Sequence, residues 1–113
     1  MQLESKKYLD DIAHACKLAL QFVAGKNLSD YLSDTMLRSA VERQLQTVGE
    51  ALVQLQKIDP AAAISISERE KIVGFRNVLV HGYANIDDRI VWGVLETKLP
   101  LLLREAESLL AEE

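Results

Sequence analysis

The sequence predicts an all-α protein, an up-and-down bundle of four to five helices folded as one domain over residues 1–113. Apolar residues recur every three or four positions along most of the chain, which is the spacing of one helix face. No segment shows the alternation of apolar and polar residues that marks a half-buried strand. A chain of 113 residues has the length of one ordinary domain.

The first predicted helix has its apolar stripe over residues 9–23. Gly25 and Asn27 follow the stripe, and both residue types tolerate the left-handed backbone found at helix C-termini. We therefore expect the first helix to end at these two residues.

A second apolar stripe runs over residues 37–55. Pro60 should stop the helix that carries it, because proline cannot donate the next backbone hydrogen bond. Asp30 or Ser33 could cap the start of this helix, since both side chains accept hydrogen bonds from backbone amides. A short additional turn could form over residues 28–32.

The third predicted helix starts at a capping box formed by Ser67 and Glu70, whose side chains would each satisfy the other's backbone amide. Its buried stripe is expected at Ile72, Phe75 and Leu79, and Gly82 should end it.

A fourth helix is predicted to open at Asp87 and to continue to the C-terminus. Pro100 lies inside it and removes one backbone hydrogen bond, so we expect a kink over residues 96–100. Helices this long in so small a domain leave apolar edges uncovered. We therefore expect a homodimer.

Composition and charge narrow the classes of function. Apolar residues make up 49% and charged residues 27% of the chain, as in soluble globular proteins. The formal net charge is −4, so any chemistry on RNA must depend on a local site rather than on a general positive field. Cys16 is the only cysteine, and the sequence contains neither a signal peptide nor an apolar run of about 20 residues. These features favour the cytoplasm and give no sign of a membrane.

Residues 76–83, Arg-Asn-Val-Leu-Val-His-Gly-Tyr, carry the main chemical signal. Arginine matches phosphate oxygens, and histidine transfers protons near neutral pH, so Arg76 and His81 meet the minimal needs of metal-free RNA cleavage. Two histidines and one cysteine cannot build a structural zinc site, and we expect neither a metal nor a cofactor.

The spacing of Arg76 and His81 raises a geometric question, because on a regular helix they lie about 140° apart. Either the helix loosens before Gly82, or Arg76 reaches round, or a dimer brings two copies of the motif together. The plainer alternative is a salt-bridged Arg76 and a His81 that only caps the helix.

The wider pattern resembles the HepT-like toxins of the HEPN superfamily, in matching order over nearly the whole chain. The similar segments are 40–45, 48–51, 76–83, 86–87, 91–92 and 99–100. The motif of the family, Arg-x4-His-x-Tyr, falls on Arg76, His81 and Tyr83, and its polar residue after the arginine is present as Asn77.

This resemblance implies an all-α homodimer whose paired motifs line a cleft at the dimer interface. Active members of the family are metal-independent endoribonucleases. They are typically encoded beside a minimal nucleotidyltransferase antitoxin, which transfers AMP from ATP to the motif tyrosine, here Tyr83. A phosphodiester anion at that position would repel RNA phosphate and block access to His81.

Arg43 and Glu50 form a second pair of candidates. Seven residues place them within about 20° of each other on a helix, opposite the apolar stripe. They could belong to an ordinary exposed polar face. Alternatively they border the cleft, with Glu50 orienting Arg43 or Arg76 and with Gly49 permitting a close approach of two helices.

The preferred hypothesis is a ribonuclease toxin of a type VII-like toxin–antitoxin pair, which cleaves RNA through a 2′,3′-cyclic phosphate and is silenced by AMPylation. Its expected site residues are catalytic Arg76 and His81, supporting Asn77, Arg43 and Glu50, and modified Tyr83. The alternative is a non-catalytic partner subunit of a nucleotidyltransferase that binds nucleotide or accepts AMP. The polar cluster over residues 76–83 argues against a third option, a purely structural dimerisation domain.

Overall fold

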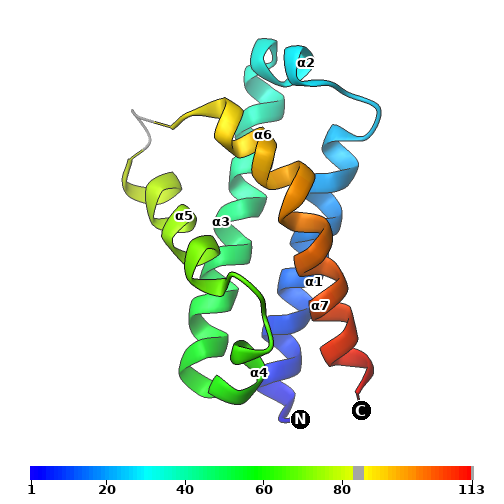
Figure 1. Cartoon of the computed structure of the whole chain (residues 1–113), viewed down its shortest axis with the longest axis vertical. Coiled ribbons are helices and arrows are strands. Elements are labelled where there is room, and N and C mark those ends of the chain that lie inside the picture. The colour runs from blue at the N-terminus through cyan, green and yellow to red at the C-terminus, as the bar shows by residue number, and fades with distance from the viewer. Residues whose placement is uncertain (83–85, 113) are drawn as a thin grey trace.

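The computed structural model describes residues 1–82 and 86–112, and within them it is an all-α bundle without a strand (Figure 1). The predicted fold class is therefore confirmed. The helices are α1 (Leu3–Val23), α2 (Leu28–Ser33), α3 (Thr35–Ile58), α4 (Pro60–Ile64), α5 (Arg69–His81), α6 (Asp88–Thr97) and α7 (Leu99–Ala111). This is more than the expected four to five helices, because the short helix α4 and the break between α6 and α7 were not anticipated, whereas α2 corresponds to the short turn expected over residues 28–32.

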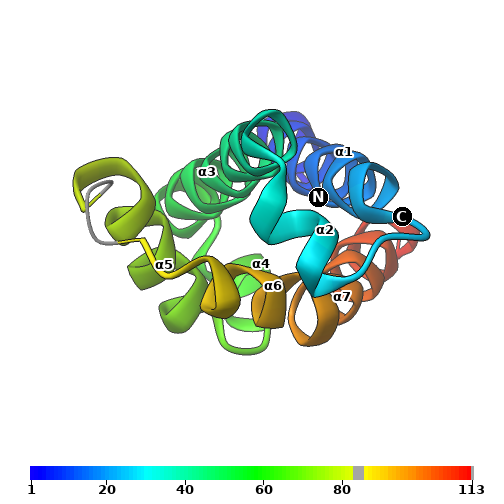
Figure 2. The ribbon, with the colours of Figure 1, turned by 90° about the horizontal axis from the view of Figure 1, so that it is seen from above.

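The long helices form two layers. Helices α1, α3 and α5 lie side by side with α3 in the middle, and α6 and α7 cover the opposite side (Figure 2). Helix α2 closes one end of the bundle and α4 the other (Figure 1). Helix α5 is thus an outer member of its layer, and α3 is its main neighbour.

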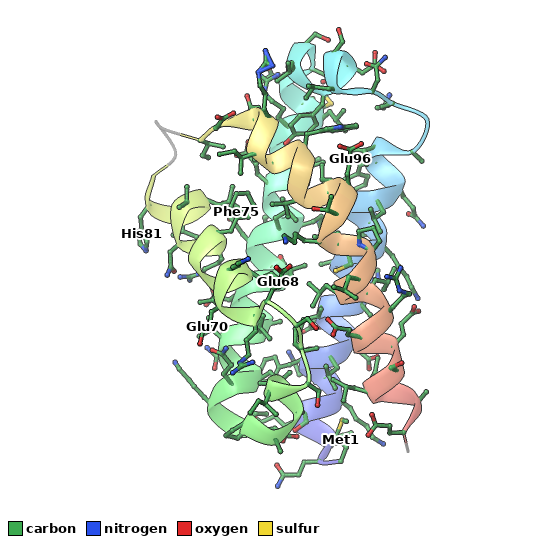
Figure 3. The ribbon with its side chains drawn as sticks, viewed as in Figure 1. Met1, Glu68, Glu70, Phe75, His81 and Glu96 are labelled. Atoms are coloured by element: carbon green, nitrogen blue, oxygen red, sulfur yellow. The ribbon has the colours of Figure 1, made fainter. Side chains whose placement is uncertain are left out.

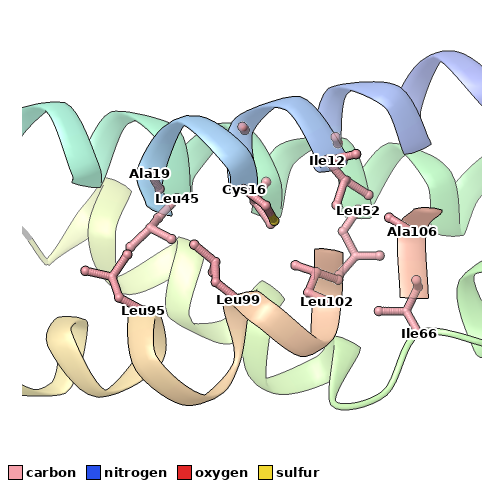
Figure 4. Packing of buried hydrophobic residues seen from close by; sticks show 14 of the residues in the cluster. Ile12, Cys16, Ala19, Leu45, Leu52, Ile66, Leu95, Leu99, Leu102 and Ala106 are labelled. Carbon is pink, nitrogen blue, oxygen red and sulfur yellow. The ribbon is translucent and has the colours of Figure 1, made fainter. Parts of the chain in front are cut away.

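The core lies between α1, α3 and α7. Leu9, Ile12, Leu52 and Leu102 are almost completely buried there, and Cys16 lies among them (Figure 4). Burial of a leucine-sized side chain contributes roughly 1.5–3 kcal/mol, so this cluster contributes substantially to the stability of the fold.

The first helix ends at Val23, and the left-handed Gly25 expected near its end follows two residues later with φ of +75°. Asn27, however, caps the next helix: its side chain accepts from the Asp30 amide, and the Asp30 side chain accepts from the Asn27 amide. The expected caps of α3, Asp30 and Ser33, are therefore wrong. Asp34 caps α3 and accepts from the Leu37 amide at 3.0 Å.

The predicted capping box at the start of α5 is also wrong. Ser67 binds Glu105 of α7 through both its amide and its hydroxyl, at 3.1 and 2.7 Å. Glu68 takes the N-cap position with a left-handed φ of +57°. A carboxylate distant in sequence therefore holds the serine that local spacing assigns to the cap.

Pro60 and Pro100 both lie in the first turn of a helix, α4 and α7 respectively. The expected kink near Pro100 is a full break, because α6 ends at Thr97 and α7 begins at Leu99. Asp87 caps α6 as predicted and accepts from the Arg89 amide at 3.0 Å.

Candidate active site

Helix α5 carries the motif that the sequence singles out. Leu79 is its one fully buried residue among the described positions, and Ile72 and Phe75 are half-buried. The expected stripe therefore faces the bundle. The helix ends at His81, where the Gly82 amide donates to the Val78 carbonyl at 2.8 Å. Tyr83 lies outside the described residues.

Arg76 is held by polar groups on both sides. Its Nε donates to Glu50 Oε2 of α3 at 3.0 Å, and its Nη2 donates to the same oxygen. Its Nη1 donates to the side-chain oxygen of Asn77 at 2.8 Å. The structure thus brings together Arg76, Asn77 and Glu50. A guanidinium has five N–H donors, so two remain for a phosphate.

Gly49 explains how Arg76 comes so close to α3. A Cβ at this buried position would lie 2.2 Å from the Cβ of Arg76 and 2.5 Å from its Cγ. Any larger residue would push the two helices apart. The helix contact at Gly49 therefore sets the position from which the Arg76 side chain extends.

His81 does not meet Arg76 within one chain. Helix α5 stays helical through His81, so the two side chains keep the separation of about 140° that a regular helix gives. His81 is exposed at the outer edge of the molecule, whereas Phe75 lies on the side that faces α6 (Figure 3). One chain presents the two groups separately.

Arg43 and Glu50 share a surface hollow, which we call the α1–α3 groove. It has a volume of about 360 Å³. Its lining consists of Lys7, Tyr8 and Asp11 of α1, then Arg43, Gln46, Thr47, Glu50, Ala51 and Gln54 of α3, and Val80 of α5. Arg43 and Glu50 therefore belong to one concave surface next to Arg76, and not to a flat polar face.

Sequence analysis missed the α1 side of this groove. Lys7 and Tyr8 lie more than thirty positions before Arg43, and nothing in their local spacing indicates that they face α3. Tyr8 lies one residue before the expected apolar stripe of residues 9–23, so the sequence alone gives no direct sign that it lines a groove.

The described part of the chain contains no group of three or more His, Cys, Asp or Glu side chains that could hold a metal ion. None of the helices described is long and apolar enough to cross a membrane.

Comparison with known proteins decides the family. The ribonuclease HepT-like family matches residues 12–109, which is most of the chain. The protein belongs to this family. Its biochemical class is therefore that of a ribonuclease. No solved structure is a significant match.

Three relatives illustrate the similarity. A provisionally named ribonuclease HepT from Thermococcus cleftensis is 31% identical over 109 residues, covering 96% of this chain and 98% of its own. A provisionally named RNase from Caldanaerobacter subterraneus subsp. tengcongensis is 29% identical and covers 96% of both chains. Another from Methanocaldococcus jannaschii is 28% identical, covering 90% of this chain and 93% of its own.

Proposed function

We propose that this ribonuclease is a metal-independent endoribonuclease that acts as the toxin of a toxin–antitoxin pair, with its active site formed by two copies of the chain. The observation that carries the proposal is the opposite placement of Arg76 and His81 on a helix that stays regular to its end. A second copy can supply the histidine that one copy cannot bring to its own arginine.

The chemistry follows from the two side chains. His81 would take the proton of a ribose 2′-hydroxyl or give one to the leaving oxygen. The 2′-oxygen attacks phosphorus, the bond to the 5′-oxygen breaks, and the 5′-oxygen receives a proton. Arg76 would stabilise the charge that develops on the phosphorane through its two unused N–H groups. The products are a 2′,3′-cyclic phosphate and a 5′-hydroxyl.

An exposed apolar side chain on α5 supports the homodimer. Val78 is 46% exposed and lies between Arg76 and His81 in the sequence. A second copy that contacts α5 at this point would bury Val78 and bring in the partner motif.

Mixing two inactive variants tests the shared site. Arg76→Ala and His81→Ala should each abolish cleavage of a labelled RNA in the presence of a chelator. In a hybrid dimer one site would lack both residues and the other would be intact. About half of the dimers in an equal mixture are hybrids, so the mixture should recover about a quarter of wild-type activity. No recovery in a mixture shown to contain hybrid dimers would mean that each site uses one chain only.

AMPylation at Tyr83 is the proposed mode of neutralisation, by a minimal nucleotidyltransferase partner in the cytoplasm. The intact mass of the protein should increase by whole AMP units when it is co-expressed with this partner, and Tyr83→Phe should show no increase. A tight complex with unchanged mass would instead indicate neutralisation by binding, and would favour the interpretation of the chain as a partner subunit.

A further inference from the structure

The α1–α3 groove adjoins the candidate active site directly. Glu50 lines the groove and also binds Arg76, and Val80 of the motif helix lies at its edge. A chain-like substrate held at Arg76 would therefore meet this groove next.

Among the described residues, Arg43 is the cation of the groove that has no ion pair. Lys7 is paired with Asp11 at 3.0 Å, and Glu50 is paired with Arg76. Arg43 is exposed and has no ion pair with any described residue. The chain as a whole is acidic, so an unneutralised guanidinium here is a local feature of the kind that binds phosphate.

The groove also offers an aromatic ring. Tyr8 is half-buried, and the Lys7 ammonium lies 4.7 Å from the centre of its ring. The Lys7 side chain is 63% exposed, so a nucleobase that displaced it from the solvent side would meet this face of the ring. An aromatic ring at the surface is a stacking platform for a nucleobase.

Two side-chain amides complete the groove. Gln46 and Gln54 lie on the same face of α3, on either side of Glu50. An amide offers both a donor and an acceptor, which suits the edge of a base. The groove thus combines one group for phosphate, one for a base plane and two for base edges.

We propose that the α1–α3 groove is a nucleotide subsite for single-stranded RNA next to the scissile phosphate. Tyr8 stacks on the base, and Arg43 binds the adjoining phosphate. This inference rests on the proposed ribonuclease function. A paired strand would not fit this scheme, because its bases are stacked on each other and cannot lie on Tyr8.

Binding experiments with the His81→Ala protein test the subsite without cleavage. The probe is a fluorescein-labelled single-stranded RNA of mixed sequence, followed by anisotropy at several salt concentrations. Adding Arg43→Ala should weaken binding and reduce the slope of log Kd against log salt by about 0.7, the value for one phosphate of a single strand. Adding Tyr8→Leu should weaken binding about tenfold and leave this slope unchanged.

Two controls match these changes. Arg104→Ala removes an exposed arginine from α7, outside the groove, and should leave binding unchanged. Tyr8→Phe keeps the ring and should bind like the parent protein. Because Tyr8 also packs against the core, each variant is compared by circular dichroism. Arg43 is exposed, so its replacement keeps the test valid even if Tyr8→Leu unfolds.

Three results would overturn the subsite. Arg43→Ala could bind RNA with the same affinity and salt slope as Arg104→Ala. The groove variants could weaken the dimer in sedimentation experiments, which would make the groove a surface for a second copy. A duplex could bind as tightly as the single strand. A wild-type protein that binds RNA in this way but cleaves none would contradict the proposed ribonuclease mechanism and leave the subsite intact.

Discussion

Helix α3 contacts its two neighbours in different ways. Toward α1 it presents buried leucines and valines, and both helices are closely packed along their length. Toward α5 it presents Gly49 and Glu50, and Leu79 is the one fully buried α5 side chain among the described positions. The contacts of α3 with α1 are those of a hydrophobic core, whereas its contacts with α5 position a charged side chain. The α1 side holds the fold, whereas the α5 side places Arg76.

The largest expected effect is the loss of stability caused by a cavity in the core on the α1 side of α3. Leu52→Ala should lower the free energy of unfolding by ~2–5 kcal/mol, because Leu52 is fully buried in the core. Leu79→Ala removes the same atoms from α5 and should reduce the global value less while abolishing ribonuclease activity. Urea denaturation and activity measurements check both. Equal losses of stability would mean that α5 belongs to the same cooperative unit as the core.

A second change tests the close contact between α3 and α5 at Gly49. Gly49→Ala should displace α5, at a cost of about 1–3 kcal/mol for overpacking, and should reduce activity strongly. Gly74→Ala is the matched control on α5, since a Cβ there meets nothing within 4 Å. It should stabilise the helix by roughly 1 kcal/mol and keep activity. A fully active Gly49→Ala protein would show that the close helix contact is dispensable.

Replacing the Glu50 carboxylate by an amide of the same shape should have a smaller effect on stability. Glu50→Gln should alter stability by only about 0–1 kcal/mol, because the Glu50 side chain is 54% exposed and the pair is screened by water. Its kcat should nevertheless fall, since Arg76 loses the carboxylate that orients it. Steady-state kinetics with denaturation curves distinguish the two quantities. If kcat stays at the wild-type value, Glu50 is not a positioning residue for Arg76.

The smallest expected effect is a change in the pH dependence of stability at Glu42, which lies in the part of α3 nearest to α2. Burial and the nearby Asp88 raise the pKa of Glu42 above its ordinary value of 4.5. The stability that this group contributes is therefore present below about pH 4.5 and is lost as pH rises through the raised pKa. Glu42→Gln should raise Tm at pH 7, and the difference from wild type should vanish at low pH.

Thermal melts between pH 4 and 8 measure this difference, with Glu96→Gln, an exposed carboxylate on α6, as control. A lower Tm for Glu42→Gln at pH 7 would identify the carboxylate instead as a useful partner of Arg38, which lowers the same pKa.

Local and distant contacts explain which features the sequence could predict. The stripes over residues 9–23 and 37–55 are correct because helix periodicity depends on neighbouring residues. The cap at Ser67 is wrong because its actual partner, Glu105, lies 38 residues away. The Arg76–Glu50 pair spans 26 residues. Sequence analysis proposed it as one alternative among several, since two helices must first pack before such a pair exists.

For the same reason, the sequence could predict the motif but not the groove. Arg76, Asn77 and His81 lie within one helix and are visible as a local pattern. Tyr8 and Arg43 become neighbours only through the packing of α1 on α3. Functional surfaces built from several helices therefore require the fold.

Polar contacts fix the start of α5 to the opposite layer of the bundle. Ser67 is bonded to Glu105 of α7, and Glu68 forms an ion pair with Lys98 at 2.6 Å. The middle of the helix is held against α3 by Gly49 and by the Glu50–Arg76 ion pair. Two separate attachments therefore set the direction of the α5 axis, and with it the direction in which the exposed His81 is presented to a second molecule. Hydrogen bonds to Lys98 and Lys71 lower the pKa of Glu68. The attachment at Glu68 is therefore complete at neutral pH and is lost only as pH falls below 4.5, through the lowered pKa.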